Sequence, residues 1–240
     1  MTGAILSSLI FLACLVLIFS DKLNRMIAGV AGAVLMVTVG KILGFYSESQ
    51  ALETVDFNTL GLLLGMMILV ALLEPTGFFQ YLAVLAGKLS RGQPVRLLVL
   101  LGATTTVLSM FLDNVTTIVL IAPVTILICE IMGIASTPYL LAEAILSDTG
   151  GVATLIGDPP NIIIGSAAGL SFVDFLIYSL PIVLVVWLAA LLMLRILFRK
   201  ELSIRPKKMK AVLRLNPAEA LNDAKTTRKV LIVLGGAIVM

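Results

Sequence analysis

The sequence of 240 residues contains no histidine, and only 13% of its residues are charged. Histidine is the side chain that most readily exchanges a proton near neutral pH, and it is a common metal ligand. Its absence excludes histidine proton relays and histidine metal sites. Any proton-coupled chemistry in this chain must therefore use carboxyl groups.

Cysteine is also scarce, since Cys14 and Cys129 are the two in the chain and both lie in apolar runs. Their number and spacing give neither a disulfide framework nor a metal motif, so both are interpreted as small buried hydrophobes. The N-terminus has no basic residue ahead of its first apolar run, and the run ends in DKLNR (21–25) rather than in a small-residue cleavage site. We expect a retained helix there, not a signal peptide.

Apolar residues are what the chain has in abundance, at 60% with a mean hydropathy of +1.12. Soluble domains average about 45–50% apolar and about 25% charged residues. The sequence therefore predicts an all-α polytopic membrane protein, built from apolar segments of about 17–25 residues. The expected membrane segments are 4–20, 26–43, 59–73, a hairpin over 95–132, a broken helix over 138–170, and 173–198. Together they would form a first transmembrane repeat over 1–198, followed by a basic linker at 199–229 and the start of another helix at 230–240.

The positions of the basic residues predict how the chain crosses the membrane. If the N-terminus is outside and each span crosses once, 16 of the 17 Lys and Arg residues fall on one side, with Lys41 as the exception. The positive-inside rule assigns that side to the cytoplasm. We expect a multi-pass protein of the plasma membrane (the inner membrane of a prokaryote) with the linker 199–229 in the cytoplasm, facing lipid headgroups and not nucleic acid. The hairpin 95–132 returns to the cytoplasmic side whether it crosses twice or is re-entrant.

The hairpin has a polar tip, FLDNVTT (111–117), between two apolar arms. Asp and Asn are common helix N-caps, so one interpretation is a turn that caps the second arm. The other is an ion site, because an ionisable residue at membrane depth is by default a functional candidate. In that case Asp113 would supply charge for Na⁺ or H⁺, and Asn114, Thr116 and Thr117 would supply oxygen ligands.

The stretch SDTGGVATLIGDPPN (147–161) carries two Asp, three Gly and a Pro pair between apolar segments. Glycine weakens a helix, proline cannot donate a backbone hydrogen bond, and the residue before proline is pushed out of helical geometry. We expect a helix that unwinds and restarts at Pro160 or Asn161, with freed carbonyls at 153–157 and a helix N-terminus that favours an anion. Irregular backbone at membrane depth is tolerated only within protein or beside a water-filled cavity. The candidate binding residues here are Asp148, Gly150, Gly151, Thr154, Gly157, Asp158, Pro159, Pro160 and Asn161.

Other acidic residues and motifs carry less chemistry. Asp148 begins the D-T-G of aspartic proteases, but that motif needs a β-rich lobe and a second copy. Gly157-Asp158 lacks the glycine at 155 that intramembrane aspartyl proteases have there, so we do not expect an enzyme. Glu143 lies about 140° from Asp148 around their helix and need not share its face. Glu74 and Glu130 are expected at span ends.

The two motifs together, FLDNVTTIVLIAPVTILICEI and AEAILSDTGGVATLIGDPPNIIIGSAAG, resemble the ion transporter superfamily. That group contains the arsenical pump membrane proteins, the citrate and dicarboxylate transporters and the NhaD-like antiporters, and the closest resemblance is to the P protein branch. The resemblance implies a re-entrant hairpin whose tip meets an unwound helix at mid-membrane, within the N-terminal half of an inverted-repeat transporter. It also implies a dimer with elevator-like alternating access.

The resemblance is not complete at the tip. The dicarboxylate branch has Ser-Asn-Thr where this chain has Asp113, Asn114 and Val115, and it usually has Thr where this chain has Asp158. A fixed carboxylate repels an anion unless it is protonated or paired with Na⁺. The two carboxylates at membrane depth instead favour cation binding, and a Na⁺ site at Asp113, Asn114 and Asp158 is one expectation.

The sequence as a whole predicts a secondary active transporter of a small anion or oxyanion, arsenite-like or carboxylate, coupled to H⁺ or Na⁺. No further cofactor is expected. The expected partners are the lipid bilayer, the substrate, a second copy in a homodimer, and a second transporter half beyond Met240. Two alternatives remain open, a Na⁺/H⁺ antiporter and a non-transporting membrane subunit or scaffold.

Overall fold

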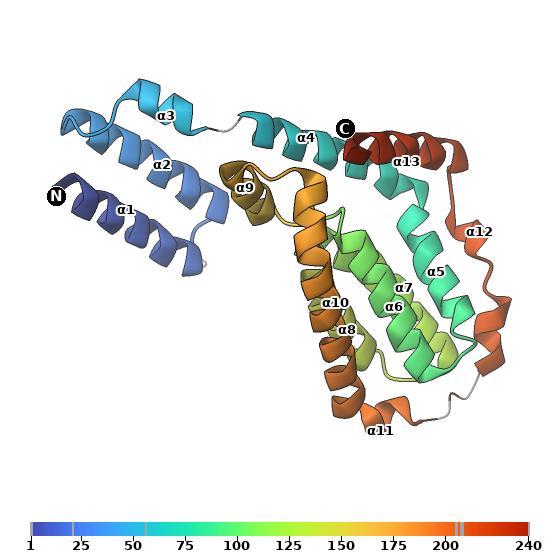
Figure 1. Ribbon diagram of the computed structural model, residues 1–240. Coiled ribbons are helices and arrows are strands. Elements are labelled where there is room, and N and C mark those ends of the chain that lie inside the picture. The colour runs from blue at the N-terminus through green and yellow to red at the C-terminus, as the bar shows by residue number, and fades with distance from the viewer. Residues whose placement is uncertain (1, 21, 56, 205, 207–208, 240) are drawn as a thin grey trace. The chain divides into compact units, whose positions relative to one another are not determined.

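The computed structural model describes residues 2–20, 22–55, 57–204, 206 and 209–239, and every regular element in them is a helix. This confirms the all-α fold class (Figure 1). The chain divides into two compact units, residues 1–58 and 59–240, each described separately. The division falls within the segment 1–198 that was expected to form one repeat.

The first unit contains α1 (Thr2–Phe19), α2 (Arg25–Ile42) and the short α3 (Glu48–Thr54). α1 and α2 pack side by side (Figure 1). Gly32 of α2 lies directly against the Cys14 side chain of α1. Ser47 and Gln50 form a capping box that starts α3, a helix that the sequence analysis did not predict. Lys41 binds the Glu48 carboxylate, and this hydrogen bond and the positive charge lower the pKa of Glu48.

The second unit contains most of α4 (Phe57–Leu73), followed by η1 (Glu74–Thr76) and α5 (Phe78–Leu89). The chain bends by 60° between α4 with η1 and α5, at Gly77, whose φ is +77°. α5 packs against both arms of the hairpin that follows, and its Phe79 and Ala83 are buried. α5 is therefore part of the helix packing of this unit.

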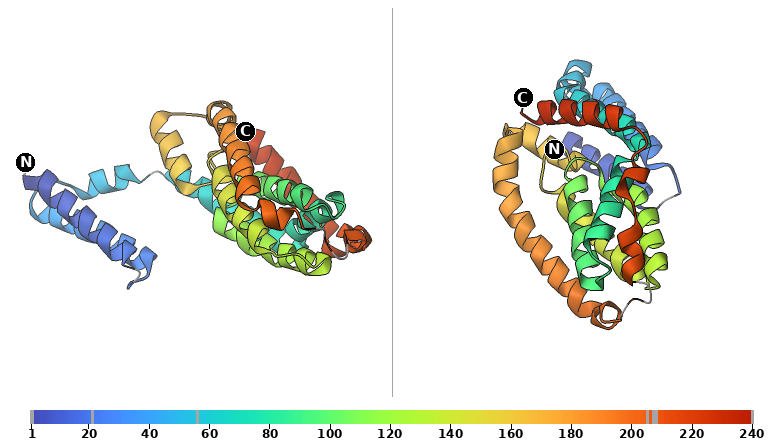
Figure 2. Two further views of the ribbon diagram at one scale, coloured as in Figure 1. Left: turned by 90° about the horizontal axis from the view of Figure 1, so that it is seen from below. Right: turned by 90° about the vertical axis from the view of Figure 1, so that its right-hand side faces the viewer.

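The expected hairpin is formed by α6 (Pro94–Ser109) and α7 (Asn114–Met132), and the expected broken helix by α8 (Thr137–Gly151) and α9 (Pro159–Ala168). α6 packs closely along α8, and α10 (Phe172–Leu197) packs on the same helix (Figure 2). Gly102 of α6 lies against Leu146 of α8, and Thr106 of α6 lies against Gly150, so α6 and α8 run parallel. This core positions the hairpin tip beside the break between α8 and α9.

The basic linker is folded onto the hairpin. It forms α11 (Arg199–Leu202), η2 (Met209–Arg214) and α12 (Pro217–Ala220), and α13 (Ala224–Val239) follows, starting before the expected residue 230. η2 packs on α5 and α7, α12 packs on α5, and Val212 is fully buried. The N–H of Asn222 donates to the carbonyl of Thr76 over 2.8 Å. The linker is therefore attached to the α5 face of the second unit.

Three helices within the described residues are long and apolar enough to span a membrane, namely α2, α7 and α10. α4 with η1 and α5 together form a bent pair that would make a fourth span. α1 and α6 are apolar but shorter. These apolar helices expose apolar side chains, as does Val185 of α10, which is 69% exposed. Such side chains suit the apolar interior of a bilayer.

Candidate functional site

The hairpin tip is a short connection between the end of α6 at Ser109 and the start of α7 at Asn114. Asp113 is the N-cap of α7, and its Oδ2 accepts from the N–H of Thr116 over 2.9 Å. The Thr117 hydroxyl donates to the Asp113 carbonyl over 3.0 Å. The structure confirms the capping role, and the Asp113 side chain is exposed.

The Asn161 side chain bridges the break between α8 and α9. Asp158 is extended, with φ −139° and ψ 136°, and α9 starts at Pro159, one residue before the earliest expected start. The Asn161 amide donates to the carbonyls of Gly151 and Thr154 over 2.8 and 2.9 Å. Of the carbonyls expected to be free for a cation, that of Thr154 is therefore already occupied.

The tip and the break are in direct contact. The Thr154 hydroxyl donates to the Met110 carbonyl and accepts from the N–H of Gly157 over 3.1 Å. The Asn114 amide donates to Asp148 Oδ1 over 2.5 Å, which joins the tip to α8. The two motifs thus meet in the structure, and their role as one binding site stays a prediction.

Two glycines permit this close contact. A Cβ on Gly157 would lie 2.8 Å from the Ser109 carbonyl oxygen, and a Cβ on Gly150 would lie 2.9 Å from the Thr106 Cα. Both distances are shorter than Cβ contacts in folded proteins. Gly150 and Gly157 are therefore needed for backbone packing, whereas a Cβ on Gly151 would lie 3.0 Å from the Asp158 carboxylate.

A cavity of about 400 Å³ lies beside the tip and the break, and α4 forms its opposite wall. Of the predicted site residues, Asp113, Thr116, Gly157 and Pro159 line it. Glu74 also lines it and adds a second carboxylate, although the sequence suggested only a position at a span end. The other predicted residues do not line this cavity: Asn114, Thr117, Asp148, Gly150, Gly151, Thr154, Asp158, Pro160 and Asn161.

The charged side chains around the site are carboxylates. Asp158 interacts electrostatically with both Asp148 and Asp113, and no Lys or Arg lines the cavity in the part of the chain that the structure describes. No three His, Cys, Asp or Glu side chains gather into a metal-binding group within that part. A Na⁺ site would thus combine a carboxylate with hydroxyl, amide or carbonyl oxygens, and the predicted set of Asp113, Asn114 and Asp158 stays a prediction.

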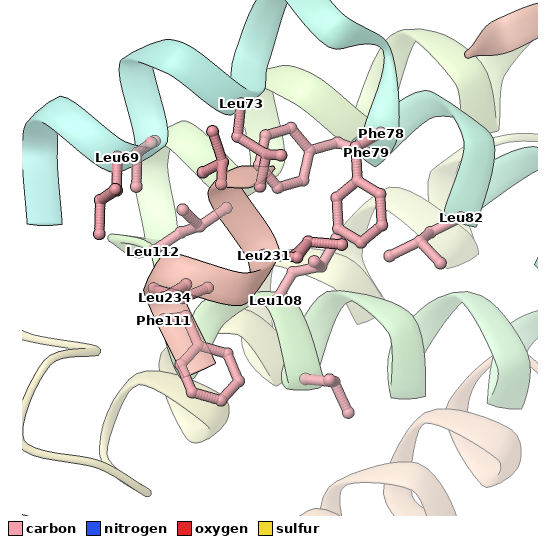
Figure 3. Close-up of a pocket in the computed structure, with 13 residues that line it drawn as sticks. Leu69, Leu73, Phe78, Phe79, Leu82, Leu108, Phe111, Leu112, Leu231 and Leu234 are labelled. Atoms are coloured by element: carbon pink, nitrogen blue, oxygen red, sulfur yellow. The ribbon is translucent and has the colours of Figure 1, made fainter. Parts of the chain in front are cut away.

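An apolar cavity of about 170 Å³ adjoins the site cavity (Figure 3). Phe111 and Leu112 of the tip line both cavities. Leu231 and Leu234 of α13 contribute to its lining, together with Phe78 and Phe79 of α5. The apolar side of the tip is thus packed on α5 and α13, and its polar side meets the break.

The sequence analysis did not single out a buried carboxyl below the tip. Glu143 of α8 is fully buried, and its Oε1 accepts a short hydrogen bond from the Thr125 hydroxyl of α7. Its Oε2 has no hydrogen-bond partner, and neither do the buried hydroxyls of Thr105 and Ser109 in α6. The signal available in the sequence was one polar residue on each of two apolar helices. It did not reveal the contact, because Thr125 and Glu143 face each other only once the hairpin is formed.

These observations define a polytopic membrane protein in which a polar hairpin tip and a helix break meet beside a cavity. Residues 15–240 match the citrate transporter family, and the chain belongs to that family.

The relatives agree with this class. The chain is 43% identical over 223 residues to a 46 kDa membrane protein of Mycobacterium leprae, covering 92% of this chain and 51% of that protein. It is 43% identical over 241 residues to an uncharacterized transporter of Mycobacterium tuberculosis H37Rv, covering 99% and 54%. It is 41% identical over 188 residues to the P protein of Homo sapiens, covering 76% and 22%. The chain thus spans about half the length of these mycobacterial relatives.

Proposed function

We propose that the protein is a secondary active transporter of a small carboxylate or oxyanion, coupled to H⁺ or Na⁺. The observation that supports this most is the joined tip and break, with Asp113, Thr116, Gly157 and Pro159 lining one cavity. The description of the family names citrate, so carboxylates are the first substrates to test, with arsenite as the oxyanion.

The chemistry of the site fits a co-transported cation better than an anion alone. A cavity with Asp113 and Glu74 repels an anion until a proton or Na⁺ neutralises the charge. Cation binding would therefore precede or accompany anion binding, which is the requirement for coupling. Alternation of access by an elevator-like movement, and assembly as a homodimer, belong to the same proposal.

The test is transport by the protein reconstituted in liposomes at the full length of its natural chain. Uptake of labelled citrate, succinate, phosphate and arsenite is measured with an inward Na⁺ gradient, with an inward proton gradient, and with neither. The proposal expects gradient-dependent uptake of at least one anion. No uptake of any anion under either gradient contradicts it.

Asp113→Asn is the decisive variant, because asparagine caps a helix as well as aspartate does. The variant keeps the start of α7 and removes the charge that would hold the cation. We expect loss of gradient-driven uptake with unchanged protein yield and thermal stability. Glu130→Gln, at an exposed carboxylate near the end of α7, is the matched control and is expected to transport as the wild type does.

A Na⁺/H⁺ antiporter is the second candidate, favoured by the acidic character of the site. In that case Asp113 and Asp158 would exchange the two cations with no anion substrate. A pH-sensitive dye inside the liposomes distinguishes the two functions, since an antiporter responds to a Na⁺ pulse without any anion. A reconstituted protein that moves neither anions nor protons would instead be a non-transporting membrane subunit.

A further inference from the structure

Glu143 lies in the interior of the second unit, away from the cavity. It is in the middle of α8, fully buried, and its hydrogen-bond partner Thr125 is fully buried on α7. No Lys or Arg pairs with it in the described part of the chain, and Oε2 has no partner. A buried carboxylate without a cation costs several kcal/mol, whereas a protonated carboxyl carries no net charge.

The groups that face Glu143 do not supply a positive charge. Cys129 of α7, whose thiol interacts electrostatically with Glu143, is buried beside it. Tyr139 lies one turn earlier on α8, and its hydroxyl donates to the Pro94 carbonyl over 3.4 Å. The charged residues of the helices packed on α8 are all exposed: Arg96 of α6, Glu130 of α7, and Asp174 and Arg195 of α10.

Buried hydroxyls lie on α8 and on the parallel helix α6 along the stretch between Glu143 and the break. Ser147 and Gly151 follow Glu143 at intervals of four residues, so they lie on nearly the same face of α8, and Gly151 is about 12 Å further along. Ser147 is fully buried, as are Thr105 and Ser109 of the parallel helix α6. The hydroxyls of Thr105 and Ser109 have no partner, and a Cβ on Gly157 would meet the Ser109 carbonyl. We call Glu143, Ser147, Thr105 and Ser109 the polar track.

Unpartnered buried hydroxyls and an unpartnered carboxyl oxygen are the groups that bind internal water. A carboxyl at membrane depth beside such groups is typical of a proton pathway. The hydrogen bond from Thr125 leaves Oε2 as the position for the proton. Movement of that proton needs only water in the polar track, which takes the proton from Oε2 and leaves the carboxylate hydrogen-bonded to Thr125.

We propose that Glu143 is the proton-carrying residue of this transporter and that the polar track connects it to the site at the hairpin tip. This inference rests on the proposed function and assigns H⁺ as the coupling ion. Asp113 contacts the substrate or its cation in the cavity, and Glu143 holds the proton below it. Binding and coupling are thus carried by different carboxyl groups.

The test separates exchange from accumulation in proteoliposomes. Exchange of labelled for unlabelled anion across the membrane needs no net proton movement, whereas accumulation driven by a proton gradient does. Glu143→Gln keeps the side-chain volume and the hydrogen bond with Thr125, and it cannot carry a proton. We expect it to exchange anion at the wild-type rate and to lose gradient-driven accumulation, while Glu130→Gln keeps both.

Two results would overturn the proposal. One is a Glu143→Gln variant that accumulates anion from a proton gradient as the wild type does, and the other is a stable variant that loses exchange and accumulation together. A wild-type protein that exchanges no anion contradicts the proposed function instead, and the proton flux after a Na⁺ pulse then tests Glu143 directly. The pulse should give no flux in Glu143→Gln.

Infrared spectroscopy of the purified protein gives a readout that does not depend on transport. We expect the carbonyl band of a protonated acid in the wild type, absent in Glu143→Gln and shifted in Thr125→Val, which removes the hydrogen bond. If Glu143→Gln does not fold, the band in the wild type and its shift in Thr125→Val and Glu143→Asp decide the question. A wild-type spectrum without that band, or a band that neither substitution moves, contradicts the assignment.

Discussion

At the scale of single residues, Asn161 stabilises the irregular segment 152–158 with its two amide hydrogens. We expect Asn161→Ala to lower the free energy of unfolding by about 2 kcal/mol or more, because the buried carbonyls of Gly151 and Thr154 lose their donor. Asn161→Asp should destabilise at least as much, since a carboxylate cannot donate to a carbonyl. Thermal unfolding of the detergent-purified protein measures both, with Ile163→Ala at an exposed position of α9 as the control.

An Asn161→Ala variant as stable as the Ile163→Ala control would mean that water replaces the amide. In that case the break would be held by the contact between Thr154 and Met110 alone.

Asp223 lies outside the expected membrane-spanning segments, and its titration is expected to change the stability of the start of α13. It caps α13, and its carboxylate accepts from the hydroxyl and the N–H of Thr226 and from the N–H of Lys225. These hydrogen bonds, with the Thr226 hydroxyl first, lower the pKa of Asp223 below its usual value. A lowered pKa means that the cap stabilises the start of α13 above the unfolded value, about 4, and that this stabilisation is lost as the pH falls through the folded value.

Hydrogen exchange of the amides at 224–230, corrected for the intrinsic pH dependence, measures this effect. Protection in the wild type should decrease on acidification below about pH 4. Asp223→Asn should remove this decrease, because its amide oxygen caps the helix without titrating. An equal loss of protection with acid in both proteins would show that another group is responsible.

At the scale of elements, the packing of the break against the hairpin tip depends on Gly157. Gly157→Ala places a methyl group against the Gly151 carbonyl oxygen within the break and 2.8 Å from the Ser109 carbonyl oxygen of the tip, so the backbones must separate. We expect a loss of about 1–3 kcal/mol of stability, as for other overpacked sites, together with loss of transport. Gly65→Ala in α4, where a Cβ meets nothing within 4 Å, is the control and should be neutral. Unchanged thermal unfolding in Gly157→Ala would show that the contact between tip and break is not tight.

The helices that the sequence predicted best are those with a chemical signal at each end. α7 begins at the capping residue Asp113 and ends at Gly133, whose φ of +68° terminates a helix. The break between α8 and α9 follows from the glycine pair and Pro159-Pro160, and its start was misplaced by one residue because proline is accepted at the first helical position. Local rules were therefore sufficient for these elements.

The features that the sequence did not predict depend on contacts between distant residues. The role of Asn161 as donor to two carbonyls is visible only when the chain folds back over ten residues. The position of Glu74 in the cavity wall depends on how α4 packs beside the tip. The burial of Glu143 against Thr125 depends on the register between α7 and α8. Periodicity along one helix does not contain this information.

At the scale of the whole molecule, the distribution of charge predicts the orientation of the chain in the membrane, which helix packing alone does not. With the N-terminus outside, the segment 43–57 is extracellular and the linker 199–229 is cytoplasmic, since 16 of 17 basic residues then lie inside. The structure adds that the linker packs along α5, with Asn222 bound to the Thr76 carbonyl before the start of α5 and η2 packed on the same helix. The membrane orientation predicted for the linker therefore applies to α5 as well.

Cysteine labelling in intact cells tests this orientation. Cys14 and Cys129 are first replaced by alanine, and a single cysteine is then introduced at Ser49 or at Ser203, both exposed. A membrane-impermeant maleimide should label Ser49→Cys in intact cells, because α3 precedes α4 on the outer side. It should label Ser203→Cys only after the membrane is permeabilised, because the basic residues around it hold the linker in the cytoplasm. The reverse pattern would invert the topology, and labelling of both from outside would show that an even number of crossings separates the two positions, against the expected odd number.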